Sequence, residues 1–411
     1  MPATGLLVLA AALAAALGLL LLALMVGAGR AGTAAVVLGM FLAPMSSLQP
    51  ITPPPVITFA DVAFVVGFAL LAPQLAGRRL DVPLPYLVGA LLLLTVSLLS
   101  VAVTAEPGVS IPAVIRLAYA SMLLPGAFLL WRPPPRQIAL LAVAYLLGVC
   151  ASLVFGLVAG PTTEGRYQGL APHPNSFGHS AAFAALLIPY LVSTMPRRRW
   201  SWYAGGVLCC YAIWISGSRA SLVAFVVVVA LAPLLERSVR ATAALLYAGA
   251  LLLVVGGRLA TAGGTNAFSR LLGAGSATDS NGQRLLRLDV TLHDFFQHPL
   301  LGAGFTQIRA AEDIYVQVLS SVGVFGLLGF VLMLYSLVRP AFAHGRAVHR
   351  LAYPALLFAV VGPLTDVLWD TLPWAVLSLA MLAIPERDTG QPRSLEEPSP
   401  TTEERLSDAP S

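Results

Sequence analysis

Seven arginines lie in segments that the charge pattern of the chain assigns to the non-cytoplasmic side, where a membrane protein usually avoids positive charge. An arginine suits phosphate, because its planar guanidinium donates two hydrogen bonds at once and keeps its charge when partly desolvated. Seven such residues together predict a site for a polyanionic, membrane-borne substrate. They are Arg166, Arg219, Arg258, Arg270, Arg284, Arg287 and Arg309.

The composition of the 411-residue chain is typical of a membrane protein. Apolar residues make up 58% of it, charged residues only 10%, and the mean hydropathy is +0.83. A soluble globule needs more polar surface than this, so the composition predicts a polytopic membrane protein. The three cysteines, Cys150, Cys209 and Cys210, lie in apolar runs without metal-ligand spacing. We expect them to be inert thiols without a disulfide.

Apolar stretches long enough to cross a hydrocarbon core of roughly 30 Å recur along residues 1–385. Two of them are short, so about 12 or 13 spans are expected in an all-α, polytopic transmembrane helix bundle. The first stretch lacks a basic leader and a convincing cleavage site, which favours a retained span over a removed signal peptide. The predicted spans are residues 5–26, 33–49, 56–76, 84–104, 110–131, 137–160, 174–195, 201–216, 220–235, 239–256, 313–338, 351–368 and 372–385.

Arginines also predict the orientation, because short arginine-rich loops stay in the cytoplasm. Alternate loops carry them, from Arg30 to the segment 339–350, whereas the loops between them carry none before residue 161. The Glu-, Pro- and Ser-rich tail, residues 386–411, is predicted to be a disordered cytoplasmic end. The largest external segment, residues 257–312 between spans 10 and 11, can form a cap with a short helix at 289–296.

Two short external motifs contain arginine. Arg166 precedes Pro174-Asn175-Ser176, where Asn175 or Ser176 can cap a helix whose N-terminus attracts anions. Arg219 lies at the junction of two spans with almost no loop. The alternatives are a plain capped helix for the first motif and a snorkelling arginine for the second. We favour a phosphate site at Arg166 and a polar cavity facing Arg219.

The long loop and the span after it carry further motifs. In chain order they are Arg284-Leu285-Leu286-Arg287, His298-Pro299-Leu300-Leu301-Gly302-Ala303-Gly304, Glu312-Asp313-Ile314-Tyr315 and Gly323-Val324-Phe325-Gly326. In order and spacing the whole set resembles the bacterial O-antigen ligase and O-antigen polymerase superfamily. The resemblance covers roughly residues 160–330, and the first five spans match only in being hydrophobic.

This resemblance implies a GT-C-like transmembrane fold and a metal-independent, inverting glycosyltransferase without a cofactor. Such an enzyme moves a glycan from a polyprenyl-diphosphate carrier to a hydroxyl of a glycan, lipid or protein acceptor. In the family, external arginines hold the diphosphate. Arg219 and Arg284 match these positions best, Arg166 matches a further one, and Arg287 matches less well. Arg258, Arg270 and Arg309 are expected only to keep the loop at an anionic surface.

The catalytic histidine of the family does not carry over, because Glu312-Asp313 replaces the usual His-Asn pair before the tyrosine. Inverting transfer needs a base beside the attacking hydroxyl and positive charge on the leaving group. Glu312 can serve as that base. The chain also resembles, by analogy, the peptidoglycan polymerases of the shape, elongation, division and sporulation family, which use a carboxylate of an external loop. Alternatively, Glu312 and Asp313 merely cap the next helix. His293 is the reserve candidate.

The predicted catalytic residues are therefore Glu312, Arg219 and Arg284. The predicted substrate-binding residues are Arg166, Asn175, Arg287, His293, Asp313 and Tyr315. The histidines show no metal-ligand spacing, and His298 is expected to shape a turn with Pro299. Charged residues inside the predicted spans receive no catalytic role; they are Asp61, Arg116, Asp366 and Asp370.

A transporter or flippase of a lipid-linked glycan is the main alternative, because the same arginines would bind the same diphosphate without any transfer. The chain shows no evident internal repeat and places its polar residues on one face, which favours the transferase. A non-catalytic membrane scaffold is the third reading. Ligase and polymerase are not separable from the sequence. The expected location is the bacterial cytoplasmic membrane, with the site facing outside, and no nucleic acid is expected as a partner.

Overall fold

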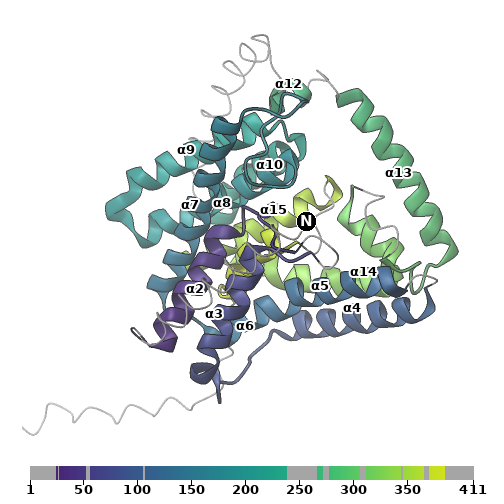
Figure 1. The fold of residues 1–411 in the computed structure, drawn as a ribbon, viewed down its shortest axis with the longest axis horizontal. Helices are drawn as coiled ribbons and strands as arrows, with labels where there is room; N and C mark the ends of the chain where they lie inside the picture. The colour runs from purple at the N-terminus through teal and green to yellow at the C-terminus, as the bar shows by residue number, and fades with distance from the viewer. Residues whose placement is uncertain are drawn as a thin grey trace, which may run out of the picture.

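The structure is a computed structural model, and its described part is built of helices, with one isolated β-bridge between Ile51 and Ile57 (Figure 1). The predicted spans at residues 5–26 and 239–256, and the tail 386–411, lie outside the described residues, as do Arg258, Arg309 and Asp366. The described residues are 25, 27–51, 56–104, 107–237, 266–271, 277–305, 312–343, 346–364 and 370–384.

Most of the helices follow the predicted spans to within a few residues. The exceptions are the span predicted at 33–49, where the helix covers residues 28–42, and the span predicted at 351–368, where the α-helix covers only residues 353–361. A π-helical turn, Tyr119–Leu123, joins α5 and α6 into one segment, and short 3-10 turns extend α14 and precede α15. The helices are α2 (Ala28–Leu42), α3 (Phe59–Leu75), α4 (Leu84–Val103), α5 (Pro107–Ala118), α6 (Leu124–Trp131), α7 (Pro135–Ala159), α8 (Pro174–Thr194), α9 (Arg199–Ser216), α10 (Arg219–Glu236), α12 (Ala267–Leu271), α13 (Ala277–Gln297), α14 (Ile314–Val338), α15 (Tyr353–Val361) and α16 (Thr371–Met381).

Seven helical segments of the described chain are long and apolar enough to cross a membrane. Three more apolar helices, α2, α3 and α16, are shorter. A 15-residue helix such as α2 spans about 22 Å, less than the hydrocarbon thickness of roughly 30 Å. The prediction of an all-α, polytopic helix bundle is confirmed, while the described residues contain fewer full-length spans than the 12 or 13 expected.

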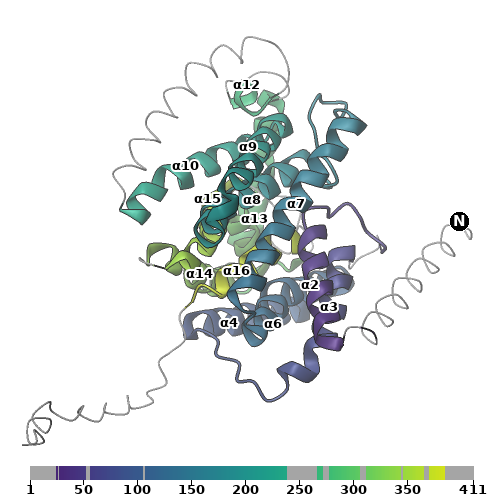
Figure 2. The same ribbon diagram turned by 90° about the vertical axis from the view of Figure 1, so that its left-hand side faces the viewer.

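Close backbone contacts between helices depend on glycine. A Cβ atom added to Gly89 of α4 would lie 2.5 Å from the carbonyl oxygen of Gly329 in α14, and one added to Gly329 would lie 2.7 Å from that of Gly89. Small residues let helices approach closely in a membrane, where the hydrophobic effect does not drive helix association and close packing does. Helix α8 contacts α7, α9, α10 and α15 and lies centrally among them (Figure 2).

Two of the charged residues inside predicted spans, Asp61 and Arg116, have partners in the bundle. Asp61 forms a capping box with Thr58 at the start of α3 and an ion pair of 3.3 Å with Arg116 of α5. The hydroxyl of Thr371, at the start of α16, donates a hydrogen bond to the same carboxylate. Because a buried charge is costly unless paired, we interpret this cluster as a structural link between the three helices.

Helix α14 is broken at Gly323, whose φ of +66° lies in the left-handed region. The break leaves the carbonyls of Ser320 and Ser321 without their usual intrahelical donors. The amides of Ala303 and Gly304 fill these places, at 2.7 Å and 3.1 Å. The loop after α13 is thus hydrogen-bonded into the kink of α14, and it fixes α13 against α14.

The close fit of this loop explains its glycines. A Cβ atom on Gly302, where φ is +72°, would lie 2.3 Å from the backbone of Ser321, and one on Gly323 would lie 2.2 Å from the carbonyl oxygen of Leu300. The amide of Gly302 also donates to the carbonyl of His298 at 2.9 Å. The turn predicted at His298 and Pro299 is present, and the residues that follow it hold this loop against the kink of α14.

Candidate functional site

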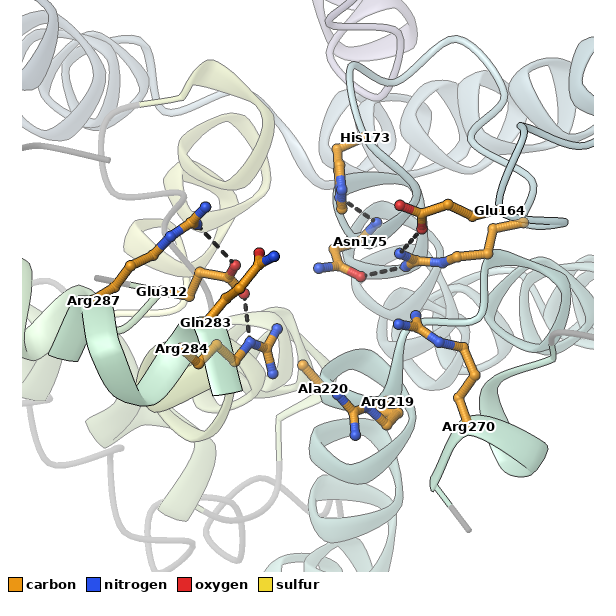
Figure 3. A pocket seen from close by; sticks show the side chains of 11 residues that line it. Glu164, His173, Asn175, Arg219, Ala220, Arg270, Gln283, Arg284, Arg287 and Glu312 are labelled. Atoms are coloured by element: carbon orange, nitrogen blue, oxygen red, sulfur yellow. Dashed lines mark hydrogen bonds and ion pairs between the residues drawn. The ribbon is translucent and has the colours of Figure 1, made fainter. Parts of the chain in front are cut away.

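A cavity of about 300 Å³ lies where six chain segments meet: the α7–α8 loop, the start of α8, the α9–α10 junction, α12, α13 and Glu312, two residues before the start of α14 (Figure 3). It brings together five of the seven external arginines. Four of these five were predicted to bind substrate or to act in catalysis, and the fifth, Arg270, was not. The lining residues are Glu164, Arg166, His173, Asn175, Arg219, Ala220, Arg270, Gln283, Arg284, Arg287 and Glu312.

Arg166 is held rigidly in one wall of the cavity and is only 3% exposed. Its Nε donates to the carbonyl of Ser216 at 3.0 Å, and its two terminal nitrogens contact Asn175 Oδ1 at 2.5 Å and Glu164 Oε2 at 3.4 Å. His173 caps α8, with its Nδ1 accepting from the amide of Asn175 at 3.1 Å. The side chain of Asn175 therefore orients a guanidinium, a task that leaves the cap to His173 rather than to Asn175 or Ser176.

Arg219 begins α10 immediately after a tight turn. Gly217, with φ of +63°, ends α9, and the hydroxyl of Ser218 caps α10 by accepting from the amide of Ser221 at 3.3 Å. Because almost no loop separates the two helices, the half-buried side chain of Arg219 is placed in the cavity wall. This position agrees with the predicted polar cavity and not with a snorkelling arginine.

Arg270 was expected only at an anionic surface, and the structure places it inside the cavity. Asn266 caps the short helix α12 through the amide of Ser269, and Phe268 stacks on Trp214 of α9 with ring centroids 6.3 Å apart. These contacts direct Arg270 inward, where it is 4% exposed and donates from one terminal nitrogen to the carbonyl of Gly217 at 2.9 Å. Only tertiary packing reveals this residue, since the loop sequence around it has no motif.

Helix α13 supplies the opposite wall through Arg284 and Arg287, which lie three residues apart and so share one helix face. Arg284 Nε is 2.5 Å from Glu312 Oε2, and Arg287 contacts Glu312 Oε1 at 3.3 Å. Glu312 is thus bound by two guanidinium groups at once. Figure 3 shows these three side chains across the cavity from Asn175 and Glu164.

Glu312 and Asp313, which the sequence left as either catalytic or capping, have different positions. Asp313 caps α14, because its Oδ1 accepts from the amides of Tyr315 and Val316 at 2.9 Å and 3.1 Å. Burial raises the pKa of Asp313 above its usual value, and these two hydrogen bonds only partly oppose this increase. The capping alternative therefore applies to Asp313, whereas the carboxylate of Glu312 points to the arginines of α13.

Three predicted substrate-binding residues do not line the cavity. Asp313 is occupied as a helix cap, and the hydroxyl of Tyr315 donates to the carbonyl of Ala359 at 2.7 Å. His293 is exposed on α13 and contacts Gln297 at 2.9 Å. Conversely, Glu164, His173, Arg270 and Gln283 line the cavity and were missed, because neither spacing nor charge alone distinguishes them.

The cavity is electropositive. Five arginines and two glutamates line it, which leaves a net of three positive charges when His173 is neutral. Desolvation, reinforced by the neighbouring charge of Arg270, lowers the pKa of Arg166 to about 10. Desolvation also lowers the pKa of Arg270. Both side chains remain protonated at neutral pH, so burial makes their charges costly and an anion would be strongly attracted.

Within the described residues, no group of three or more histidine, cysteine, aspartate or glutamate side chains could hold a metal ion. The three cysteines are free thiols, as predicted. The side chains that line the cavity offer guanidinium, carboxylate, imidazole and amide groups.

No protein-family model matches the chain, and no curated protein is significantly similar to it. The resemblance to O-antigen ligases and polymerases stays a prediction from the motifs at residues 160–330.

Proposed function

We propose that this protein is a metal-independent, inverting glycosyltransferase that moves a glycan from a polyprenyl-diphosphate carrier to an acceptor hydroxyl. The observation that carries the proposal is the cavity itself, in which five arginines and the carboxylate of Glu312 meet at one end of an apolar helix bundle. A diphosphate joined to a lipid matches both the positive charge of the cavity and the membrane character of the bundle.

The arginines suit the leaving group of such a transfer. When the acceptor oxygen attacks the anomeric carbon, the bond from that carbon to the phosphate oxygen breaks, and its electrons pass to the diphosphate. Fixed guanidinium groups stabilise the charge that develops there, and burial strengthens their effect. Arg219 and Arg284, which lie in different walls of the cavity, are the residues to which we assign this role.

Glu312 supplies the base in this proposal. Its carboxylate accepts the proton of the attacking hydroxyl, so that the hydroxyl attacks opposite the departing diphosphate and the configuration inverts. In the structure, both carboxylate oxygens are engaged by Arg284 and Arg287. A donor diphosphate competes for the same guanidinium groups, so donor binding would release Glu312 for the acceptor.

The wider setting is part of the same proposal. Cytoplasmic arginine-rich loops would leave the cavity on the outer face of a bacterial cytoplasmic membrane, in a GT-C-like fold. The acceptor would be a glycan, a lipid or a protein in the assembly of a cell-surface polysaccharide. A transporter of the same donor would use the arginines but would have no need of a base at Glu312, which makes that residue the discriminating one.

Arg284→Ala is expected to weaken donor binding by about 10- to 100-fold, because it removes charge-assisted hydrogen bonds to the diphosphate. Arg219→Ala should act in the same direction. Binding of a polyprenyl-diphosphate-linked glycan to detergent-purified protein measures both. The matched control is Arg136→Ala, which removes an exposed arginine from the first turn of α7, at the opposite end of that helix from the cavity. Unchanged binding in both cavity variants would contradict the proposed function.

A further inference from the structure

Four of the five arginines that line the cavity form two pairs, which differ in burial. Arg166 and Arg270, which we call the inner pair, are 3% and 4% exposed. They donate to consecutive carbonyls, those of Ser216 and Gly217, so their guanidinium groups are neighbours. Arg284 and Arg287, the outer pair, have side chains that are 24% and 46% exposed and belong to α13.

The two pairs differ in how their charge is neutralised. Glu312 contacts both members of the outer pair. Glu164 forms an ion pair with Arg166 at 3.4 Å, its charge also raises the pKa of Arg270, and its side chain is 54% exposed. The Nε of Arg270 has no hydrogen-bond partner among the described residues. The buried pair thus has the weaker neutralisation, although burial makes an uncompensated charge more costly.

The stability of the fold does not explain why two arginines are buried side by side while the Nε of Arg270 lacks a partner among the described residues. Burial lowers the pKa of both side chains, and the neighbouring charge of Arg270 lowers the pKa of Arg166 further. Hydrogen bonds to backbone carbonyls fix the two guanidinium groups in position. Donors preorganised in this way favour the binding of an anion. A phosphate group would satisfy the unused Nε and neutralise both charges.

We propose that Arg166 and Arg270 form an inner phosphate subsite, distinct from the outer pair, that binds the lipid-linked phosphate of the donor. This inference rests on the proposed function for the identity of the donor. The sugar-linked phosphate belongs at the outer pair, because Glu312 must reach the acceptor beside the anomeric carbon and Glu312 lies there. Arg270 is then a binding residue of the cavity and not a surface charge of the loop.

Inorganic phosphate is the probe for the inner subsite, since Glu312 already occupies the outer pair. Phosphate and pyrophosphate should both raise the unfolding temperature of the purified full-length protein. Arg270→Met should weaken phosphate binding by about 10-fold or more, whereas Arg287→Ala should leave phosphate binding within about 2-fold of wild type. We expect pyrophosphate, which has two phosphate groups, to bind more weakly after either substitution.

The stability of the unliganded variant separates a binding role from a structural one. Methionine keeps the volume of Arg270 and removes a buried charge beside Arg166, so Arg270→Met should unfold without anion at the wild-type temperature or above. Arg270→Lys, which keeps charge but not the planar fork, should bind phosphate weakly. A lowered unfolding temperature together with undiminished phosphate binding in Arg270→Met would overturn the subsite.

Two further comparisons identify the phosphate source and separate this inference from the proposed function. Farnesyl diphosphate should bind more tightly than pyrophosphate, and equal binding would overturn the assignment to a lipid-linked phosphate. If phosphate binding requires Arg270 but no glycan transfer occurs with any polyprenyl donor, the subsite stands and the transferase falls. If transfer occurs and Arg270→Met transfers and binds phosphate normally, the transferase stands and the subsite falls.

Discussion

Glu312→Gln is expected to reduce glycan transfer by about 10²- to 10⁴-fold while donor binding is kept or strengthened. Glutamine retains the shape of the side chain but cannot accept the proton of the acceptor hydroxyl. It also removes the negative charge that pairs with Arg284 and Arg287, so the donor diphosphate meets less competition for these two guanidinium groups. Transfer rate and donor binding, measured on the same preparation, separate the two effects.

The control for this variant is Glu164→Gln, which neutralises the other glutamate of the cavity wall. Glu164 forms an ion pair with Arg166, and its loss should change transfer by less than about 10-fold. Full transfer in Glu312→Gln would remove the base from Glu312. His293 would not readily replace it, because its exposed side chain does not line the cavity in this structure. Transport of the donor without any transfer by the wild type would favour the flippase.

Gly302→Ala is expected to destabilise the protein by about 2 kcal/mol or more and to impair transfer severely. The new Cβ would meet the backbone of Ser321 at 2.3 Å, in a residue whose φ is +72°. The loop would have to leave the kink of α14, and α13 would lose its fixed position. Arg284 and Arg287 would then no longer be aligned with Glu312. Thermal unfolding and donor binding, measured together, check this expectation.

Gly282→Ala provides the matched control, because Gly282 lies in α13 one residue before Gln283 and nothing is found within 4 Å of the added Cβ. Alanine there should leave stability unchanged or raise it by about 0.5–1 kcal/mol, as in other exposed helix positions. Wild-type stability and activity in Gly302→Ala would show that the loop does not position α13.

Much of the fold could be predicted from the sequence, because hydropathy reports directly on which segments enter a membrane. The helix at Ile314–Val338 and the turn around His298 were predicted and are confirmed. The helix expected at 289–296 is part of the 21-residue α13. Its full extent was missed because its first half is polar and lacks the apolar pattern by which a buried helix is usually identified.

The sequence by itself determined that the chain is a polytopic helical membrane protein, and it singled out Arg166, Arg219, Arg284 and Glu312. Only the tertiary structure decided which of the polar residues meet. It placed Arg270 in the cavity through the stacking of Phe268 on Trp214, and it gave Asp313 to a helix cap while Glu312 was left to the arginines. The reason is physical. Hydropathy fixes the depth of an apolar helix, whereas the positions of charges in a polar loop depend on packing and hydrogen bonds between segments distant in sequence.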